Sequence, residues 1–549
     1  MNSFHLTMQA VDFKDLAGSS KLFLDFINHR APAKDYYKYD FRQSESYRQV
    51  ALEIDRKPYD RKQLVSILTH AVSPLDISRK IKENIDKLSL PDSLCVFGGQ
   101  QVGMLLGPNY TILKALTAYK LAIKLEAELD RPVVPCFWLA SDDHDFEEIK
   151  TAHFLDRAGD CLGISYEPAK LQEALPMSDL FFDSYIEDFI SAVEAIFQPT
   201  EFSVEIMKWI KNAYRQDQSV SASFAGLFNR VLAEFGIIPV DPNYAGMKEL
   251  FIPLFGEEID GHQEIFDIFE SQSRRIIGAG YHRQVEKNSE LLNLFITNNG
   301  ARRNIIAKGD QFSIDGHEAV SRGELLHLLE NEPMRFSANV ILRPIAQCSA
   351  FPTLAQIVGP SEAAYFAQIE PMYRYHGVPW PVIRPRIFAT LLEPHIKKSI
   401  QKLSIDFANL YNDPDREMTR IVTAQYPPEF QKKAETLRTL IERPLHELAI
   451  SADNIDKESA DALEYTRKRI DHELNHLSKK LLRAHKKRHE NIINQARRMA
   501  AFLFPMGKFQ ERVLSPIYFM NKYGLDIFTG IEQKLDIECI GHQLIEVRK

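Results

Sequence analysis

The chain has 549 residues, of which 45% are hydrophobic and 26% charged, and its formal net charge is −8. This length predicts two or three structural units, the composition is typical of a globular protein, and the negative charge argues against nucleic acid as a partner. The opening residues show no signal-peptide pattern, no run of about 18 apolar residues suggests a membrane span, and the five scattered cysteines favour a cytoplasmic protein with free thiols.

Residues 95–150 are predicted to form a βαβ unit. A short apolar run at 95–97 leads into a glycine pair, and a helical pattern of apolar residues begins near Asn109. Pro132 ends that helix because it disfavours the α conformation of the preceding residue. The continuous apolar run 133–140 indicates a strand buried on both faces. Ligands bind beyond the carboxyl ends of strands in open parallel sheets, so the polar residues that follow both strands are candidate site residues.

The first candidate group follows the first of these strands. It comprises Gly98, Gly99, Gln100, Gln101 and Gly103. The backbone N–H groups of such a turn can bind an anion, and glycine lets a ligand approach closely. Alternatively, the glycines only supply a turn that requires positive φ. Their spacing matches neither the dinucleotide fingerprint nor the Walker loop.

The second candidate group is the cluster Asp142, Asp143, His144 and Asp145, just beyond the second strand. These side chains could bind a metal, hold an ammonium group or perform acid–base chemistry. Alternatively, the acids cap the helix predicted to begin near Phe146, although a cap accounts for only one of them. Their position at a strand end favours a function.

Residues of about 155–330 are predicted to form an insertion. Within it, 248–295 has a helical pattern with a break at two glycines, and 302–315 has the pattern of a β-hairpin. The parallel sheet is predicted to resume with a strand at 337–343 that ends in Arg343.

Two further strands are predicted after this one, from Ala355 to a Gly359-Pro360 turn and from 378 to 385, and a helix begins at Pro360. The third candidate group accompanies these three strands: Asn339, Arg343, Gln347, Gly359, Glu362, Tyr365, Arg384 and Arg386. The arginine fork matches carboxylate or phosphate. The alternative, surface ion pairs, is less natural at the ends of apolar strands.

Residues 391–503 are poor in glycine and rich in Lys, Arg, Glu and Leu, which predicts a helical hairpin or coiled coil. Pro444 is expected to kink or end one of its helices. The basic segment 467–498 could attract RNA or a nucleotide phosphate, but such a run is more often a solvated helix face. The segment 504–549 is predicted to return to the globular core formed by residues 1–390.

Five segments together resemble the bacillithiol-synthesis cysteine ligases of the BshC type: 99–114, 132–149, 339–347, 358–365 and 510–512. They occur in the family's order and span nearly the whole chain. Two departures stand out. Ser141-Asp142-Asp143 replaces the frequent Gly/Ala-Glu-Asp, and Val358 stands where a second glycine is common; neither removes a charged group.

The resemblance implies an α/β fold with a Rossmann-like core similar to class I aminoacyl-tRNA synthetases, helical insertions and a coiled-coil domain linked to homodimerisation. It also implies a ligase that adds L-cysteine to glucosaminyl-malate through an amide bond. By analogy with the synthetases, ATP with Mg would activate the carboxylate through an adenylate. The chain has neither a HIGH nor a KMSKS motif, and it shows no clear ligand set for a metal.

On this resemblance, catalytic roles are expected for Asp142, His144, Asp145 and Arg343. The substrates would meet Gln100, Gln101, Asn339, Gln347, Glu362, Tyr365, Arg384 and Arg386, and the nucleotide would lie near Gly98, Gly99, Gly103 and Gly359. Two other hypotheses stay open: a metal-dependent hydrolase built on residues 142–145, and a non-catalytic coiled-coil scaffold.

Overall fold

The computed structural model describes residues 8–73, 77–156, 159–170, 174–309, 311–316, 318–424, 428–453, 457–488 and 490–547. The chain divides into two compact units. The first comprises Met1–Leu391 and Lys508–Lys549, and the second comprises Leu392–Gly507.

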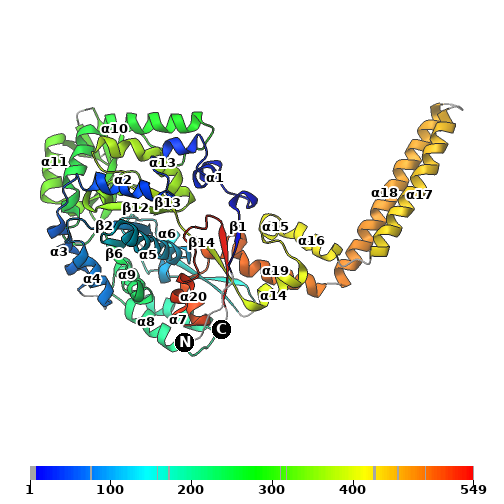
Figure 1. The fold of residues 1–549 in the computed structure, drawn as a ribbon, viewed down its shortest axis with the longest axis horizontal. Coiled ribbons are helices and arrows are strands. Elements are labelled where there is room, and N and C mark those ends of the chain that lie inside the picture. Colours follow the sequence, from blue (N-terminus) through cyan, green and yellow to red (C-terminus); the bar gives the residue numbers. More distant parts are fainter. Residues whose placement is uncertain are drawn as a thin grey trace. The chain divides into compact units, whose positions relative to one another are not determined.

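A five-stranded parallel sheet with the order β13-β12-β2-β3-β6 forms the centre of the first unit (Figure 1). Strands β2 (Leu94–Gln100) and β3 (Val133–Leu139) pair in parallel, and helix α5 (Tyr110–Leu129) connects them. Helix α5 ends before Asp130, which adopts a left-handed conformation with φ 52°. The predicted α/β core with its βαβ unit is therefore confirmed.

The glycine pair belongs to β2 rather than to a turn, which corrects the prediction. Gly98 and Gly99 do not have positive φ, so the turn alternative also fails for them. Their role is close packing. A Cβ on Gly99 would lie 3.0 Å from Trp138 Cβ on the neighbouring strand, and one on Gly98 would lie 3.3 Å from Lys114 Cγ.

The remaining parallel strands are β6 (Ile238–Val240), β12 (Thr353–Val358) and β13 (Val382–Pro385). Helix α13 (Pro360–Tyr375) follows β12 directly, as predicted. Strand β13 begins four residues later than the predicted 378, because proline at 379 and 381 has no backbone N–H to donate to a ladder.

A second, antiparallel sheet has the order β10-β9-β8-β7-β11. Its strands are β7 (Leu291–Asn298), β8 (Ala301–Lys308), β9 (Gln311–Ile314), β10 (Glu318–Ser321) and β11 (Phe336–Ala338). The hairpin predicted at 302–315 is present as β8 and β9. The helical prediction for 248–295 is correct for α10 (Ile252–Gly278) and wrong for the residues of β7.

The strand predicted at 337–343 is also wrong in extent and in partner. Strand β11 ends at Ala338 and pairs antiparallel with β7, not with the parallel sheet. Arg343 begins helix α12 (Arg343–Ala350). The side chain of Asn339 turns the chain into this helix by accepting hydrogen bonds from the N–H groups of Ile341 and Leu342, and Pro344 suits a first helical turn.

Shorter elements complete the first unit. They are α1 (Lys21–Ile27), α2 (Ser44–Ile54), α3 (Arg61–Val72), α4 (Arg79–Lys87), α6 (Phe146–Ile149), β4 (Thr151–Leu155), β5 (Cys161–Ser165), α7 (Ile186–Ile196), α8 (Ser203–Ala213), α9 (Val220–Val231), α11 (Arg322–Asn331), α20 (Pro516–Tyr523) and α21 (Ile527–Glu532). A third sheet joins β1 (Met8–Val11), β15 (His542–Glu546) and β14 (Phe388–Leu392), so both ends of the chain belong to this unit.

The second unit is helical: α14 (Pro394–Leu403), α15 (Phe407–Asn412), α16 (Pro414–Ala424), α17 (Pro428–Asp453), α18 (Lys457–Arg488) and α19 (Glu490–Leu503). Helices α17 and α18 lie side by side as a long hairpin, as predicted (Figure 1). Helix α17 continues through Pro444, so the helix does not end there, which was one of the two expected effects of this proline. Across the described part of the chain, no helix has the length and apolarity needed to cross a membrane.

Candidate functional site

A cavity of about 550 Å³ lies beyond the carboxyl ends of the central parallel strands. Ten residues expected from the sequence to form a site line it: Gly99, Gln100, Gln101, Asp142, Asp143, Asn339, Arg343, Gly359, Glu362 and Arg386. The further lining residues include Lys114, Trp138, Glu148, Phe295, Arg302 and Arg512. The fold thus brings together polar groups from widely separated stretches of the chain.

A buried lysine lies at one side of this cavity. Lys114 on α5 has a side chain that is 2% exposed, and its Nζ lies 2.6 Å from Glu362 Oε2 at the start of α13. It also donates to the backbone oxygen of Gly99 at 2.7 Å and to Gln100 Oε1 at 3.1 Å. Burial lowers the pKa of Lys114, while Glu362 acts in the opposite direction. The lysine therefore joins the end of β2 to the start of α13.

An acidic pair occupies another part of the cavity. Gln101 Nε2 donates to Asp143 Oδ2 at 2.8 Å and to Glu148 Oε2 at 2.7 Å. Asp143 Oδ1 accepts from the backbone N–H groups of His144 and Asp145, which fixes the orientation of the carboxylate. Two carboxylates held together by a neutral amide form a suitable acceptor for an ammonium group.

The rest of the Asp-rich cluster is engaged elsewhere. Asp142 lines the cavity but pairs with the buried Lys248 at 2.9 Å. Asp145 caps α6 by accepting from the N–H of Glu148, which is the alternative considered for one acid. His144 and Asp145 are exposed and are not among the described residues that line the cavity. The catalytic roles expected for these two residues therefore receive no support from their positions.

Two arginines supply positive charge from elements outside the parallel sheet. Arg343, at the start of α12, donates to the Tyr365 hydroxyl at 3.3 Å, and its guanidinium lies 5.9 Å from the centre of the Trp138 ring. Arg302, on β8, stacks over Phe295 at 3.9 Å. Burial lowers the pKa of Arg302. Both side chains retain donors that a carboxylate in the cavity could use.

Trp138 adds a further donor to this region. It lines the cavity, and its indole N–H is buried and has no hydrogen-bond partner among the residues that the structure describes. A buried donor without a partner is costly and requires an explanation. An oxygen atom of a bound ligand would satisfy it.

The two arginines associated with β13 serve mainly as structural residues. Arg384 is buried and donates to the carbonyl oxygens of Phe41 and Ile537, and it is not among the described residues lining the cavity. Arg386 lines the cavity but forms a two-point ion pair with the buried Glu511. Burial opposes ionisation of Glu511, yet Arg386 holds its pKa below the ordinary value. The expectation that Arg384 meets substrate therefore receives no support from its position.

Other expected site residues lie outside the cavity lining and contact residues near it. Gln347 is buried and donates to Gln356 Oε1 at 2.8 Å, and Tyr365 is the partner of Arg343. Burial raises the pKa of Tyr365 to about 12, so its hydroxyl stays protonated. Gly98 and Gly103 are likewise outside the described lining; a Cβ on Gly103 would lie 3.0 Å from the Cα of Gly107.

Sequence reasoning missed several members of the cavity for identifiable reasons. Lys114 occupies a position on the largely buried helix α5, and a charged residue among buried apolar ones is a signal that could have been followed. Arg302 belongs to a hairpin that showed no sign of facing the parallel sheet. Arg512 was noted only as part of a polar triplet in the tail.

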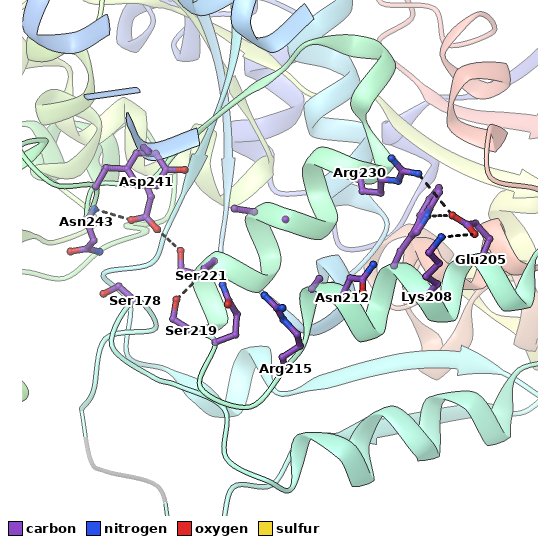
Figure 2. Close-up of a pocket in the computed structure, with 18 residues that line it drawn as sticks. Ser178, Glu205, Lys208, Asn212, Arg215, Ser219, Ser221, Arg230, Asp241 and Asn243 are labelled. Atoms are coloured by element: carbon purple, nitrogen blue, oxygen red, sulfur yellow. Dashed lines mark hydrogen bonds and ion pairs between the residues drawn. The ribbon is translucent and has the colours of Figure 1, made fainter. Parts of the chain in front are cut away.

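A second cavity, of about 620 Å³, adjoins the first, and Figure 2 shows the side chains that line this second cavity. Asp241 and Asn243 line the second cavity, whereas Pro242 between them lines the first. The wall at this point is therefore a single stretch of backbone. Helices α8 and α9 contribute most of the remaining lining.

Asp241 holds this wall in place. Its buried carboxylate accepts hydrogen bonds from the hydroxyls of Ser141 and Ser221, and burial raises its pKa. Asn243 also donates to the Ser141 hydroxyl, at 2.9 Å. Because Ser141 directly precedes Asp142, this network sets the path of the chain as it leaves β3 and enters the first cavity.

No cluster of three or more His, Cys, Asp or Glu side chains suited to a metal ion occurs within the described ranges of the chain. The acidic residues of the first cavity instead pair with Lys248, Gln101 and Lys114. This donor set fits an organic substrate with amine and carboxylate groups.

Comparison with known proteins adds family information to this geometry. Residues 6–387 match the family model "Bacillithiol biosynthesis BshC, N-terminal Rossmann-like domain", and residues 389–547 match "Bacillithiol biosynthesis BshC, C-terminal coiled-coil domain". Similar curated proteins carry the name "Putative cysteine ligase BshC". The protein from Salinibacter ruber is 29% identical over 528 residues, which are 96% of each chain. The one from Solibacter usitatus is 28% identical over 533 residues, which are 97% of this chain and 98% of the relative.

Proposed function

This chain belongs to the bacillithiol biosynthesis BshC family, and we propose that it is a ligase that joins the carboxyl group of L-cysteine to the amine of glucosaminyl-malate. The observation that carries this proposal is the charge pattern of the first cavity. Carboxylates for two amines lie in separate places, at Asp143 with Glu148 and at Glu362, and arginines for the malyl carboxylates lie beside them.

The acidic pair suits the ammonium group of cysteine. Gln101 holds the carboxylates of Asp143 and Glu148 together, so an ammonium ion between them would replace no existing ion pair. Charge-assisted hydrogen bonds of this kind are stronger than neutral ones. Cysteine bound there would direct its carboxyl group away from the acids and towards the arginines.

The malyl carboxylates suit the arginine side of the cavity. Arg343 and Arg302 both retain guanidinium donors, and the indole N–H of Trp138 lies in the same lining. Arginine binds carboxylate at two points, which fixes orientation as well as charge. We therefore assign the malyl group to Arg343, with Arg302 and Trp138 as additional donors.

Amide formation from a free carboxylate requires activation, and we propose ATP with Mg as its source. The nucleotide, when bound, would supply the phosphate-containing leaving group on the cysteine carboxyl. Arg512 and Ser361 line the cavity and fit such a group, because Arg512 is exposed and shows no ion pair to another described residue. Their place is to bind and orient phosphate oxygens.

We also propose that the protein is a cytoplasmic homodimer formed through the helices of the second unit. Several leucines on α17 and α18 are exposed there, including Leu437, Leu440, Leu448 and Leu477. A second copy of the hairpin would cover them. Sedimentation equilibrium of the wild type and of a Leu440→Glu, Leu448→Glu variant tests this; a wild-type monomer at micromolar concentration would contradict it.

The function is tested by supplying glucosaminyl-malate, L-cysteine and ATP to the pure protein and measuring bacillithiol by mass spectrometry. Product is expected only when all three are present. The nucleotide product separates the routes, since AMP with pyrophosphate indicates an adenylate and ADP with phosphate indicates an acyl phosphate. Absence of bacillithiol with folded protein and all three substrates would overturn the proposal.

A further inference from the structure

Lys114 has no donor left for a substrate. Its ammonium group has three N–H bonds, and the structure gives it three acceptors: Gly99 O, Gln100 Oε1 and Glu362 Oε2. The group is also almost completely buried, at 2% exposure. A buried cation with all its donors engaged acts on the residues that it touches rather than on a ligand.

Glu362 is fixed at one oxygen and available at the other. Its Oε2 accepts from Lys114 Nζ at 2.6 Å and from the N–H of Gly359 at 2.7 Å. No described residue forms a hydrogen bond or ion pair with Oε1. The side chain is 23% exposed and lines the first cavity. One oxygen is thus anchored to the protein while the other is open to a ligand.

The other carboxylates of the cavity are committed differently. Asp142 pairs with Lys248, and Asp143 has both oxygens engaged, by Gln101 and by two backbone N–H groups. Glu148 is exposed and shares Gln101 with Asp143. Glu362 is therefore the carboxylate best held to accept a proton at a defined point.

We propose that Glu362 binds the amine of the sugar substrate and takes its proton during amide formation, and that Lys114 is the residue that positions Glu362. This inference rests on the proposed function. The amine nitrogen forms a bond to the cysteine acyl carbon, the bond from that carbon to the oxygen of the activating phosphate group breaks, and the amine proton moves to Glu362 Oε1. The carboxyl is that of cysteine, and its activating phosphate group comes from a nucleoside triphosphate. That group leaves with the electron pair of the broken C–O bond, as AMP or as inorganic phosphate, so the step balances.

The position of Arg343 agrees with this assignment. Its partner Tyr365 lies three residues after Glu362 on α13, so the two side chains share one face of the helix. In glucosaminyl-malate the amine and the malyl group occupy neighbouring ring carbons. A single sugar can therefore place its carboxylates at Arg343 and its amine at Glu362, leaving the acidic pair at Asp143 for cysteine.

A double-mutant cycle tests both roles. Glu362→Gln keeps the size of the side chain and removes its basicity, so kcat for amide formation is expected to fall roughly 100-fold or more. The KM for cysteine should stay within about twofold, since cysteine binds elsewhere. Lys114→Met keeps the shape of the lysine and should lower kcat by a similar factor. The double variant should be no slower than Glu362→Gln, because Lys114 acts through Glu362.

Independent, multiplying effects of the two substitutions would overturn the positioning role, and normal kcat in Glu362→Gln would overturn the whole inference. Glu370→Gln, on the same helix but paired with the exposed Arg374, is the matched control and should behave as wild type. If Lys114→Met does not fold, Lys114→Arg is measured in its place. A fall in kcat in Lys114→Arg as large as that in Glu362→Gln would contradict the positioning of Glu362 by a cation. Wild-type enzyme that makes no bacillithiol would refute the proposed function instead.

Discussion

Arg386 and Glu511 form a two-point ion pair in which both side chains are buried, at 3% and 1% exposure. Arg386 Nη1 lies 2.9 Å from Glu511 Oε2, and Nη2 lies 2.6 Å from Oε1. The pair links the end of the parallel sheet to the segment that returns from the second unit. It therefore explains why an arginine at a predicted ligand-binding edge is largely unavailable to a ligand.

Breaking this pair should destabilise the protein strongly. Glu511→Gln leaves the Arg386 guanidinium buried without a counter-charge, which typically costs about 3–5 kcal/mol of unfolding free energy. The double variant Arg386→Met, Glu511→Leu should lose much less unfolding free energy than its two single variants lose in sum, because no unpaired charge remains. Urea unfolding measures both. Arg374→Gln, which removes an exposed ion pair, should cost under about 1 kcal/mol; equal effects at the two sites would contradict the assignment.

Arg343 should determine recognition of the malyl group. Arg343→Met is expected to raise the KM for glucosaminyl-malate roughly 10- to 100-fold, as for the loss of one or two charge-assisted hydrogen bonds, and to leave the KM for cysteine nearly unchanged. Steady-state kinetics with each substrate varied in turn provides the test. An analogue in which the malyl carboxylates are replaced by methyl groups should bind wild type and variant equally. If the KM for glucosaminyl-malate is the same in Arg343→Met and in wild type, Arg343 does not have this role.

The acidic pair should determine recognition of cysteine. Asp143→Asn removes one of the two carboxylates that Gln101 joins, so the KM for cysteine should rise roughly tenfold while that for glucosaminyl-malate stays close to wild type. The matched control is Glu147→Gln, whose exposed carboxylate pairs with Lys150. If Asp143→Asn instead changes only the KM for glucosaminyl-malate, the two amine sites have been assigned in the wrong order.

The buried His542 should make stability depend on pH. Burial lowers its pKa from 6.5 to about 4, so the folded protein keeps the ring neutral while the unfolded chain binds a proton below 6.5. The stabilisation is present above pH 6.5 and is lost as the pH falls towards 4, to a total of roughly 3 kcal/mol. Between pH 7 and 5, His542→Gln should therefore lose about 2 kcal/mol less unfolding free energy than wild type.

Urea unfolding at the two pH values checks this difference, since the remaining titrating groups affect both proteins alike. His282→Asn, which replaces an exposed imidazole, should show the wild-type response. An identical pH response in wild type and His542→Gln would show that this histidine is not held neutral by the fold.

The sequence alone was sufficient to predict the βαβ unit and the edge of the sheet that forms the cavity. Residues 95–139 are contiguous, and their apolar pattern records burial along one continuous stretch, so β2, α5 and β3 follow from local periodicity. The glycine pair was misread because two adjacent glycines are typical both of a turn and of a strand packed closely against its neighbour. Only the contact of Gly99 with Trp138 separates these cases.

The tertiary structure decided which charged side chains remain free to meet a ligand. Arg384 and Arg386 look alike in the sequence, yet partners at Ile537 and Glu511, more than a hundred residues away, engage both. Conversely, Arg302 lines the cavity from a hairpin that no local pattern connects to it. Local periodicity reports burial of a residue's own segment, whereas ion pairs and cavity walls depend on distances between segments that are set only when the whole chain is packed.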